Sequence, residues 1–294
     1  MDYSGMNRTV FTDNKGRSET YQFDNSGRTV SIRSSTGYMR TYSYVSGSEE
    51  NNKTANALKS VGGGEKFVRN MLRDPSFERG GSWSLSAASY ATDAHYLGTR
   101  SVKLTGSGAY ASQTRTVLSG YTYYSFSAYV KTDGDNTDAA VSMKFLDASG
   151  NTLSTVKSNP IDYTTDWQRI SISGKIPDGT AKIRVRCITG GAGTAWFDCA
   201  QLEKGVCVNA YNLAENGSFD DSGNSSVWSA SGASGSDGLT WSDSDGFYKF
   251  TGGSDAAKRV KQSIPINRVG NKTFLTVSAQ AKGSSVPLES GRHF

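Results

Sequence analysis

Aromatic side chains on predicted strand faces are the residues whose type and spacing could bind a ligand. In the segment YYSFSAYVK, alternation places Tyr123 and Tyr129 on one face together with Lys131. Flat rings can stack on the C–H faces of sugars, while nearby amides and charges bind the hydroxyls. The candidate sugar contacts are Tyr123, Tyr129, Trp83, Tyr110, Lys131 and Arg169.

Trp83 allows two interpretations. It follows the glycine pair Gly80–Gly81, so its ring could form a platform in a loop. A tryptophan here, like Trp167, could instead plug one end of a β-sandwich, and the sequence favours that interpretation. Which rings share a surface stays open, because the strands divide between two sheets.

Catalytic motifs are missing. The histidines are His95 and His293, and the chain has no GxSxG, Walker or HExxH motif. A glycosidase-type pair of acids is defined by separation in space, which the sequence leaves open. We expect a binding protein and not an enzyme.

The cysteines Cys187, Cys199 and Cys207 lack CxxC spacing, which argues against a zinc site. We expect free, buried thiols. The segment GGAG, Gly190–Gly193, is predicted to be a hairpin turn in which Cys187 faces Trp196.

Composition favours an all-β protein. The 294 residues include 33 glycines, 15 tyrosines and 12 phenylalanines, which suits short strands joined by tight turns. Apolar runs are too short for a membrane span. The net charge of +5 is scattered along the chain, so nucleic-acid binding is not expected.

Residues 67–204 are predicted to form one complete β-sandwich. Several segments show period-two alternation, for example AVSMKFLD and AKIRVRCIT. One-sided strands at this spacing indicate two antiparallel sheets packed face to face. The residues predicted to face inward are Phe126, Ala128, Val130, Val141, Met143, Phe145, Ile170, Ile172, Ile183, Val185, Cys187, Phe197 and Cys199.

This segment resembles a jelly-roll carbohydrate-binding module. The matching motifs come in the family's order: N-x-L…SFE…W, GTRSVKLTG, YTYYSFSAYVKT, DASGNTL, TTDWQRISIS and AWFDCAQLE. The resemblance implies a jelly-roll fold and binding of a polysaccharide or cell-surface glycan. The same fold also serves as a spacer, so a structural role without sugar binding is the alternative.

The resemblance also implies a structural calcium ion, because the family often carries one where its first and last strands meet. The matching acids are Glu78 and Asp198, with carbonyl oxygens near Ser76 and Thr99–Arg100 as further ligands. The alternative is that both acids are hydrogen-bonded in turns or solvated.

Residues 1–45 are predicted to form hairpins. The strands SETYQF, RTVSIRS and MRTYSYV alternate with turns at Asn14–Gly16, Asn25–Gly27 and Thr36–Gly37. Tyr21–Arg28 resembles the YD repeat of Rhs-type and wall-associated bacterial proteins, which implies a bacterial surface or secreted location. The polar stretch 46–66 is predicted to be a linker, in which a short helix is possible.

Residues 209–294 repeat the opening of the sandwich. Ser76–Glu78 matches Ser218–Asp220, and Ser127–Lys131 matches Ser278–Lys282. Counterparts of the later strands are absent, so we expect a truncated second sandwich that is poorly ordered or finds a partner. The start of the chain lacks the apolar stretch of a signal peptide. Either the protein is cytosolic or the chain is a piece of a larger protein. With the YD-repeat resemblance and the truncated repeat, we expect a piece of a larger protein, with neighbouring domains as partners.

Overall fold

The structure is a computed structural model of the chain. It describes residues 8–12, 18–24, 27–34, 39–44, 58–63, 69–118, 123–134, 136–164, 166–205, 208–209, 211–219, 221–233, 235–240, 246–252, 257–266, 277, 279 and 282–283. The chain divides into two compact units, residues 1–68 and 69–294. No helix among the described residues is long and apolar enough to cross a membrane.

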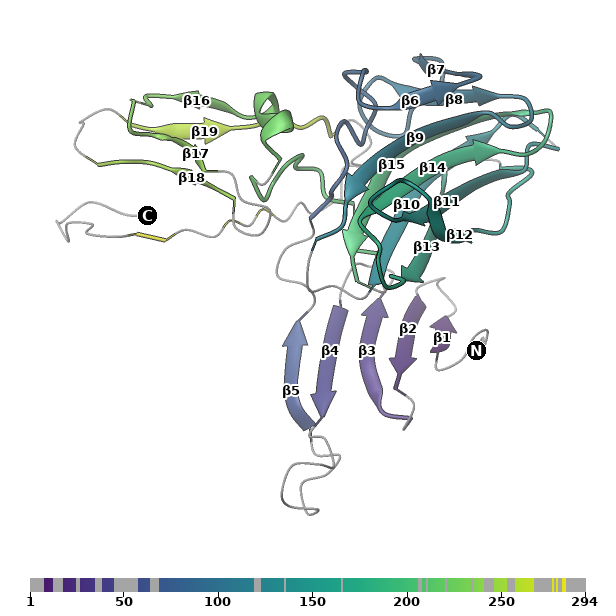
Figure 1. The fold of residues 1–294 in the computed structure, drawn as a ribbon, viewed down its shortest axis with the longest axis horizontal. Coiled ribbons are helices and arrows are strands. Elements are labelled where there is room, and N and C mark those ends of the chain that lie inside the picture. Colours follow the sequence, from purple (N-terminus) through teal and green to yellow (C-terminus); the bar gives the residue numbers. More distant parts are fainter. Residues whose placement is uncertain are drawn as a thin grey trace. The chain divides into compact units, whose positions relative to one another are not determined.

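The first unit contains a five-stranded antiparallel sheet in sequence order (Figure 1). Asp24 fixes the turn between its second and third strands: the carboxylate accepts the Arg28 amide hydrogen at 3.0 Å and pairs with its guanidinium at 2.7 Å. Gly27 adopts a φ of 75°, which favours glycine. The turns predicted at Asn14–Gly16 and Thr36–Gly37 lie outside the described residues. The strands are β1 (Arg8–Thr12), β2 (Ser18–Phe23), β3 (Thr29–Ser34), β4 (Met39–Tyr44) and β5 (Leu58–Gly63).

The predicted linker 46–66 is wrong at its C-terminal part. Residues Leu58–Gly63 form β5, which pairs antiparallel with β4. Strand pairing satisfies backbone groups whatever the side chains are, so a polar, glycine-rich segment can extend a sheet that offers an open edge. The short helix considered for this region is absent from 58–63.

The second unit contains the predicted sandwich, built from two five-stranded antiparallel sheets. Sheet I has the strand order β13-β10-β15-β8-β7, and sheet II has the order β12-β11-β14-β9-β6. Figure 1 shows their long strands in teal and green. The bounds are β6 (Ser84–Ser86), β7 (Ala88–Ala91), β8 (Ser101–Thr105), β9 (Tyr110–Thr116), β10 (Tyr123–Thr132), β11 (Ala139–Leu146), β12 (Thr152–Lys157), β13 (Gln168–Lys175), β14 (Lys182–Thr189) and β15 (Thr194–Lys204).

The core lies between the two sheets. Of the residues predicted to face inward, Phe126, Val141 and Val185 are fully buried, as are most of the others. Full burial of such a side chain contributes roughly 1.5–3 kcal/mol. The alternation read from the sequence is thereby confirmed, with Ile170 only partly buried against the same cluster.

The Gly190–Gly193 segment joins the two sheets and is not a hairpin turn. Strand β14 belongs to sheet II and β15 to sheet I, so Cys187 pairs with Val141 and Ala111 instead of Trp196. The segment packs against residues 136–138, where a Cβ on Gly191 would overlap the Asn136 carbonyl. Close backbone approach explains the glycines better than a hairpin does.

A β-bulge in β15 changes the alternation beyond Phe197. The register against β10 shifts between Ser127 and Tyr129, and Cys199 has a φ of 49°. As a result Ala200 belongs to the core cluster in place of the predicted Cys199. Cys187 and Cys199 are nevertheless free and buried, as expected. Cys207 lies outside the described residues.

The remainder of the second unit holds short elements. The 3-10 helix η1 (Ser222–Val227) precedes β16 (Ser229–Ser231), which pairs with β19 (Arg259–Lys261). Strand β17 (Gly238–Thr240) pairs with β18 (Phe247–Lys249). The expected match of Ser127–Lys131 to Ser278–Lys282 falls almost wholly outside the described residues.

Candidate functional site

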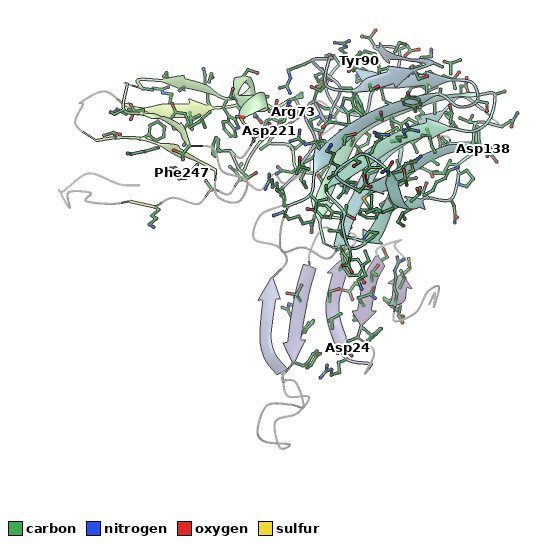
Figure 2. The ribbon with its side chains drawn as sticks, in the orientation of Figure 1. Asp24, Arg73, Tyr90, Asp138, Asp221 and Phe247 are labelled. Atoms are coloured by element: carbon green, nitrogen blue, oxygen red, sulfur yellow. The ribbon has the colours of Figure 1, made fainter. Side chains whose placement is uncertain are left out.

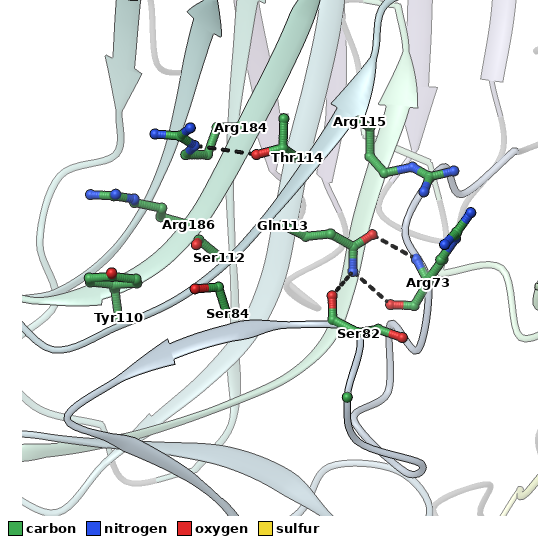
Figure 3. Close-up of a pocket in the computed structure, with 11 residues that line it drawn as sticks. Arg73, Ser82, Ser84, Tyr110, Ser112, Gln113, Thr114, Arg115, Arg184 and Arg186 are labelled. Atoms are coloured by element: carbon green, nitrogen blue, oxygen red, sulfur yellow. Dashed lines mark hydrogen bonds between the residues drawn. The ribbon is translucent and has the colours of Figure 1, made fainter. Parts of the chain in front are cut away.

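A polar cleft of about 500 Å³ lies on sheet II and the segment beside it (Figure 3). Serine and threonine hydroxyls, one tyrosine ring and four guanidinium groups surround it, which makes its lining much more polar than apolar. The lining residues are Arg73, Gly81, Ser82, Ser84, Tyr110, Ser112, Gln113, Thr114, Arg115, Arg184 and Arg186.

Strand alternation explains which side chains reach the cleft. On β14, Ile183 and Val185 fill the core, so Arg184 and Arg186 project from the outer face. Antiparallel pairing then sets their neighbours. Arg184 lies opposite Thr114 and Arg186 opposite Ser112 on β9, and Ser112 in turn lies opposite Ser84 on β6.

Tyr110 and Arg186 form one end of the cleft. The guanidinium carbon of Arg186 lies 4.5 Å from the centre of the Tyr110 ring, a cation–π contact. The Arg186 Nε is buried and has no hydrogen-bond partner. Arg184 donates from Nε to the neutral Thr114 hydroxyl at 3.3 Å. None of the ion pairs described in this structure includes either arginine.

Gln113 and Asp221 organise the other end. Gln113 accepts the Arg73 amide hydrogen at 2.9 Å and donates to the Arg73 and Ser82 carbonyls, so its amide group holds the backbone in place (Figure 3). Asp221 pairs with Arg73 at 2.5 Å (Figure 2). It also pairs with Arg115 at 2.7 Å. Burial alone would raise the pKa of Asp221, but the two guanidinium groups lower it below its ordinary value.

The predicted sugar contacts do not share one surface. Tyr110 lies in the cleft on sheet II, whereas Tyr123, Tyr129, Lys131 and Arg169 are on β10 and β13 of sheet I. One face of the Tyr129 ring is covered by Tyr96, with centroids 3.7 Å apart. Arg169 donates to the carbonyl of Asn209 and the hydroxyl of Ser127. Of these residues, Tyr123 has an exposed ring, and its relative solvent exposure is 38%.

Trp83 is not an exposed platform. Its side chain is buried, packs 4.8 Å from the Phe77 ring and donates from Nε1 to the Asp74 carbonyl at 3.0 Å. The candidate role of Trp83 in ligand contact is therefore corrected, and the alternative of a plug in the sandwich is the one the structure shows.

The sugar contacts predicted from the sequence do not include Arg186, Ser112 or Ser84. Alternation in AKIRVRCIT already places Arg186 on the outer face, so one signal was present. What brings Arg186 to Tyr110 is the pairing of β14 with β9, strands separated by more than sixty residues. Sequence periodicity carries no information about which distant strands pair.

The predicted calcium ligands Glu78 and Asp198 both bind the segment from Tyr96 to Arg100. Glu78 accepts amide hydrogens from Thr99 and Arg100, at 2.8 and 2.9 Å. Asp198 accepts those of Tyr96 and Leu97, at 2.8 and 3.0 Å. Burial raises the pKa of Asp198 to about 7. Ser76 is half-buried in the turn that precedes Glu78.

The two carboxylates fit calcium in ligand type, since calcium prefers oxygen ligands and a cation would offset the burial of Asp198. Three hydrogen bonds to each carboxylate already use most of its roughly four acceptor positions. Among the described residues, no three acids, histidines or cysteines gather as a metal site would require. The remaining ligands would have to be carbonyl oxygens or water.

The sandwich matches the model of a known protein family. The model of the family described as Carbohydrate binding domain, CBM_4_9, matches residues 69–194. These residues are similar to that family. The matched stretch runs from the first residue of the second unit to the first residue of β15, so it contains every strand of the cleft. Domains of this family bind carbohydrates and do not themselves catalyse a reaction.

Curated relatives match a longer stretch. The chain is 28% identical over 244 residues to the tRNA nuclease WapA of Bacillus subtilis (strain 168) and, to the same extent, to the tRNA3(Ser)-specific nuclease WapA of Bacillus spizizenii. These matches cover 74% of this chain and 10% of each relative. The chain thus spans about a tenth of the length of the curated relatives it matches.

Solved structures of carbohydrate-binding modules are also similar to the chain. The CBM22-1 xylan-binding domain of Paenibacillus barcinonensis Xyn10C is 18% identical, with a TM-score of 0.39 over 49% of this chain and 99% of that one. TmCBM61, solved with β-1,4-galactotriose, is 21% identical, with a TM-score of 0.35 over 47% and 99%.

Proposed function

We propose that the carbohydrate-binding domain binds a polysaccharide or cell-surface glycan, without catalysis, in the cleft on sheet II. The observation that carries this proposal is the cleft itself, a hollow lined by a ring and many hydrogen-bonding groups on a domain of this family. Such a combination of one apolar surface with several polar groups suits a sugar, which has both C–H faces and hydroxyls.

The roles of the side chains follow from their chemistry. Tyr110 supplies the ring, and the hydroxyls of Ser84, Ser112 and Thr114 can donate to or accept from sugar hydroxyls. Arg184 and Arg186 add donors that face the same space. The strands hold these groups on a rigid sheet, which limits the entropy lost on binding.

A glycan array with the whole chain tests the proposal. Tyr110→Ala should abolish binding to the glycans that the wild-type chain binds. Tyr123→Ala should leave this binding unchanged. Tyr123 is a matched control because its ring is exposed on the other sheet. Loss of binding only in a Tyr129→Ala variant would move the site to sheet I and contradict the proposal.

The alternative is a spacer role without sugar binding. It is favoured by the contacts that tie the sandwich to the segment after it: Arg73 pairs with Asp221, and Arg79 with Glu215. Such contacts would stiffen a chain of modules. Failure of the wild type to bind any glycan, in a buffer that contains calcium, would favour this alternative.

We further propose that the chain is part of a larger bacterial surface or secreted protein. The Asp24–Arg28 turn, the resemblance to YD repeats and the Bacillus relatives support this location. The domain boundaries 1–45, 67–204 and 209–294 belong to the same proposal. Calcium binding by Glu78 and Asp198 stays a prediction, as does a second, truncated sandwich in 209–294.

A further inference from the structure

We propose that the ligand of the cleft is an acidic glycan, whose carboxylate or phosphate groups bind Arg184 and Arg186. The inference rests on the proposed glycan binding and names the chemical class of the sugar.

Sheet II has basic side chains and no acidic ones. The strands β6, β9, β11, β12 and β14 contain no Asp or Glu. The acids of sheet I, Asp198 and Glu203 on β15, are both buried, so they add no charge to its surface. A mixed surface would be expected if charge served solubility alone. The basic residues of sheet II are Arg115, Lys144, Lys157, Lys182, Arg184 and Arg186.

The pairing of strands gathers this charge around the cleft. Lys144 on β11 lies opposite Arg184, and Arg184 opposite Thr114 on β9. In the next row, Arg186 lies between Ser142 and Ser112. Like charges placed side by side repel unless an anion lies between them. The arrangement therefore raises the affinity of the face for an anionic ligand.

Internal acids neutralise only one end of the cleft. Asp221 bonds to Arg73 and Arg115. At the other end Arg184 bonds to a neutral hydroxyl, and the buried Nε of Arg186 has no hydrogen-bond partner. A buried donor without an acceptor is costly, and an anionic oxygen would satisfy it with a charge-assisted hydrogen bond.

The guanidinium group suits carboxylate and phosphate oxygens because its planar fork donates two parallel hydrogen bonds. The cleft contains one aromatic ring, Tyr110, which is few for a site that would rely on stacking. Proteins that bind single-stranded nucleic acid stack successive bases on several rings. The observations thus favour an acidic sugar over a nucleic acid.

Isothermal titration of the whole chain tests the inference. The probes are polygalacturonate, its methyl-esterified and hence neutral form, a phosphomannan, the corresponding neutral mannan and a single-stranded oligonucleotide. We expect one acidic glycan to bind at least about tenfold more tightly than its neutral counterpart, with the preference reduced in high salt. The two acidic polymers separate a carboxylate ligand from a phosphate ligand.

Matched variants locate the binding. Arg184→Gln and Arg186→Gln should each weaken binding of the acidic glycan about tenfold, the effect of losing one charge-assisted hydrogen bond. Arg259→Gln on β19 makes the same change of charge outside the sandwich and should leave binding unchanged. Circular dichroism confirms that each variant is folded. An equal loss in Arg259→Gln would show a non-specific charge effect and overturn the inference.

The remaining outcomes separate this inference from the proposed function. Equal binding of neutral and acidic glycans in the cleft would overturn the acidic class and leave glycan binding intact. Binding of the oligonucleotide as tightly as the acidic glycan would overturn the inference in favour of a general polyanion site. Binding of no glycan on a broad array would overturn the proposed function, and with it the inference.

Discussion

Phe219 repeats the backbone conformation of Phe77, with φ values of 52° and 58°. Each phenylalanine packs on a tryptophan, Trp228 or Trp83, with centroids 4.9 and 4.8 Å apart. The sequence repeat at an offset of 142 residues, from Ser76 to Ser218, is therefore also a repeat of local structure.

Asp74 and Asn216 organise these two turns. Both have left-handed φ values, 45° and 49°. The carbonyl of Asp74 accepts from the Phe77 amide and the Trp83 indole, and the carbonyl of Asn216 accepts from Phe219 and Trp228 in the same way. Their side chains differ in a manner that a mutation can test.

Exchanging the two side chains should have unequal effects. The Asp74 carboxylate accepts the amide hydrogens of Arg79 and Gly80, so Asp74→Asn loses one acceptor and should lower the free energy of unfolding by about 1 kcal/mol. The Asn216 amide nitrogen donates to the carbonyls of Asp221 and Asn224. Asn216→Asp would place a carboxylate against two carbonyls and should cost more. Chemical denaturation measures both values, and a smaller loss in Asn216→Asp would contradict the argument.

Gly98 should not tolerate a side chain. It has a φ of 74°, and a Cβ there would overlap the Glu78 carboxylate. Gly98→Ala should lower the free energy of unfolding by about 2 kcal/mol or more, because backbone strain and a clash act together. Gly150→Ala is the control: its φ is 93°, but a Cβ would meet no atom within 4 Å. An equal loss of unfolding free energy in the two variants would show that the Glu78 side chain can move aside at little cost.

Calcium should stabilise the protein through Glu78 and Asp198 if these acids bind it. We expect the melting temperature to rise on addition of calcium to chelator-treated protein, and to fall again with chelator. The shift should be absent in Asp198→Asn, which removes one charged ligand. An equal shift in Asp198→Asn, or no shift in the wild type, would assign both acids to the hydrogen bonds they make with Tyr96–Arg100.

Asp221 should stabilise the protein above acidic pH. The pKa of its carboxyl is lowered in the folded state by Arg73 and Arg115, so the unfolded chain binds a proton more readily. The stabilisation is therefore present above the unfolded pKa, near 4, and is lost as pH falls through the folded value. The difference in unfolding free energy between wild type and Asp221→Asn should shrink as pH falls from 6 to 3. A difference that is constant with pH would contradict this role.

Asp221→Asn should also change binding in the cleft. Without the Asp221 charge, Arg73 and Arg115 are no longer neutralised at their end of the cleft. Affinity for the acidic glycan should rise a few-fold and become more sensitive to salt. Isothermal titration at two salt concentrations measures both effects, with Asp237→Asn, which removes an acid that pairs with Lys258, as the charge-matched control.

Local patterns in the sequence predict the sandwich well. Val141, Met143 and Phe145 alternate with polar residues, and all three are buried between the sheets. Such alternation depends only on neighbours along the chain, which is why it can be read directly. The family motifs of the same stretch likewise agree with the matched family.

Features that depend on contacts between distant segments were not predictable. The bulge in β15 reverses the expected facing of Cys199, and only the shifted register against Ser127 and Tyr129 reveals it. The cleft arises because β9 and β14 pair and bring Tyr110 beside Arg186. Period-two reasoning assigns each residue to a face but not to a neighbour.

Two ion pairs join the two repeats, and in each pair the arginine binds the counterpart of the other arginine. Asp221 corresponds to Arg79 and Glu215 to Arg73 at the 142-residue offset, yet Arg73 pairs with Asp221 and Arg79 with Glu215. This is the reciprocal pattern of a two-fold interface, with the sign of both charges inverted in one copy. Two identical copies would present four like charges to each other, so these two ion pairs exist only because the two repeats have diverged at these positions.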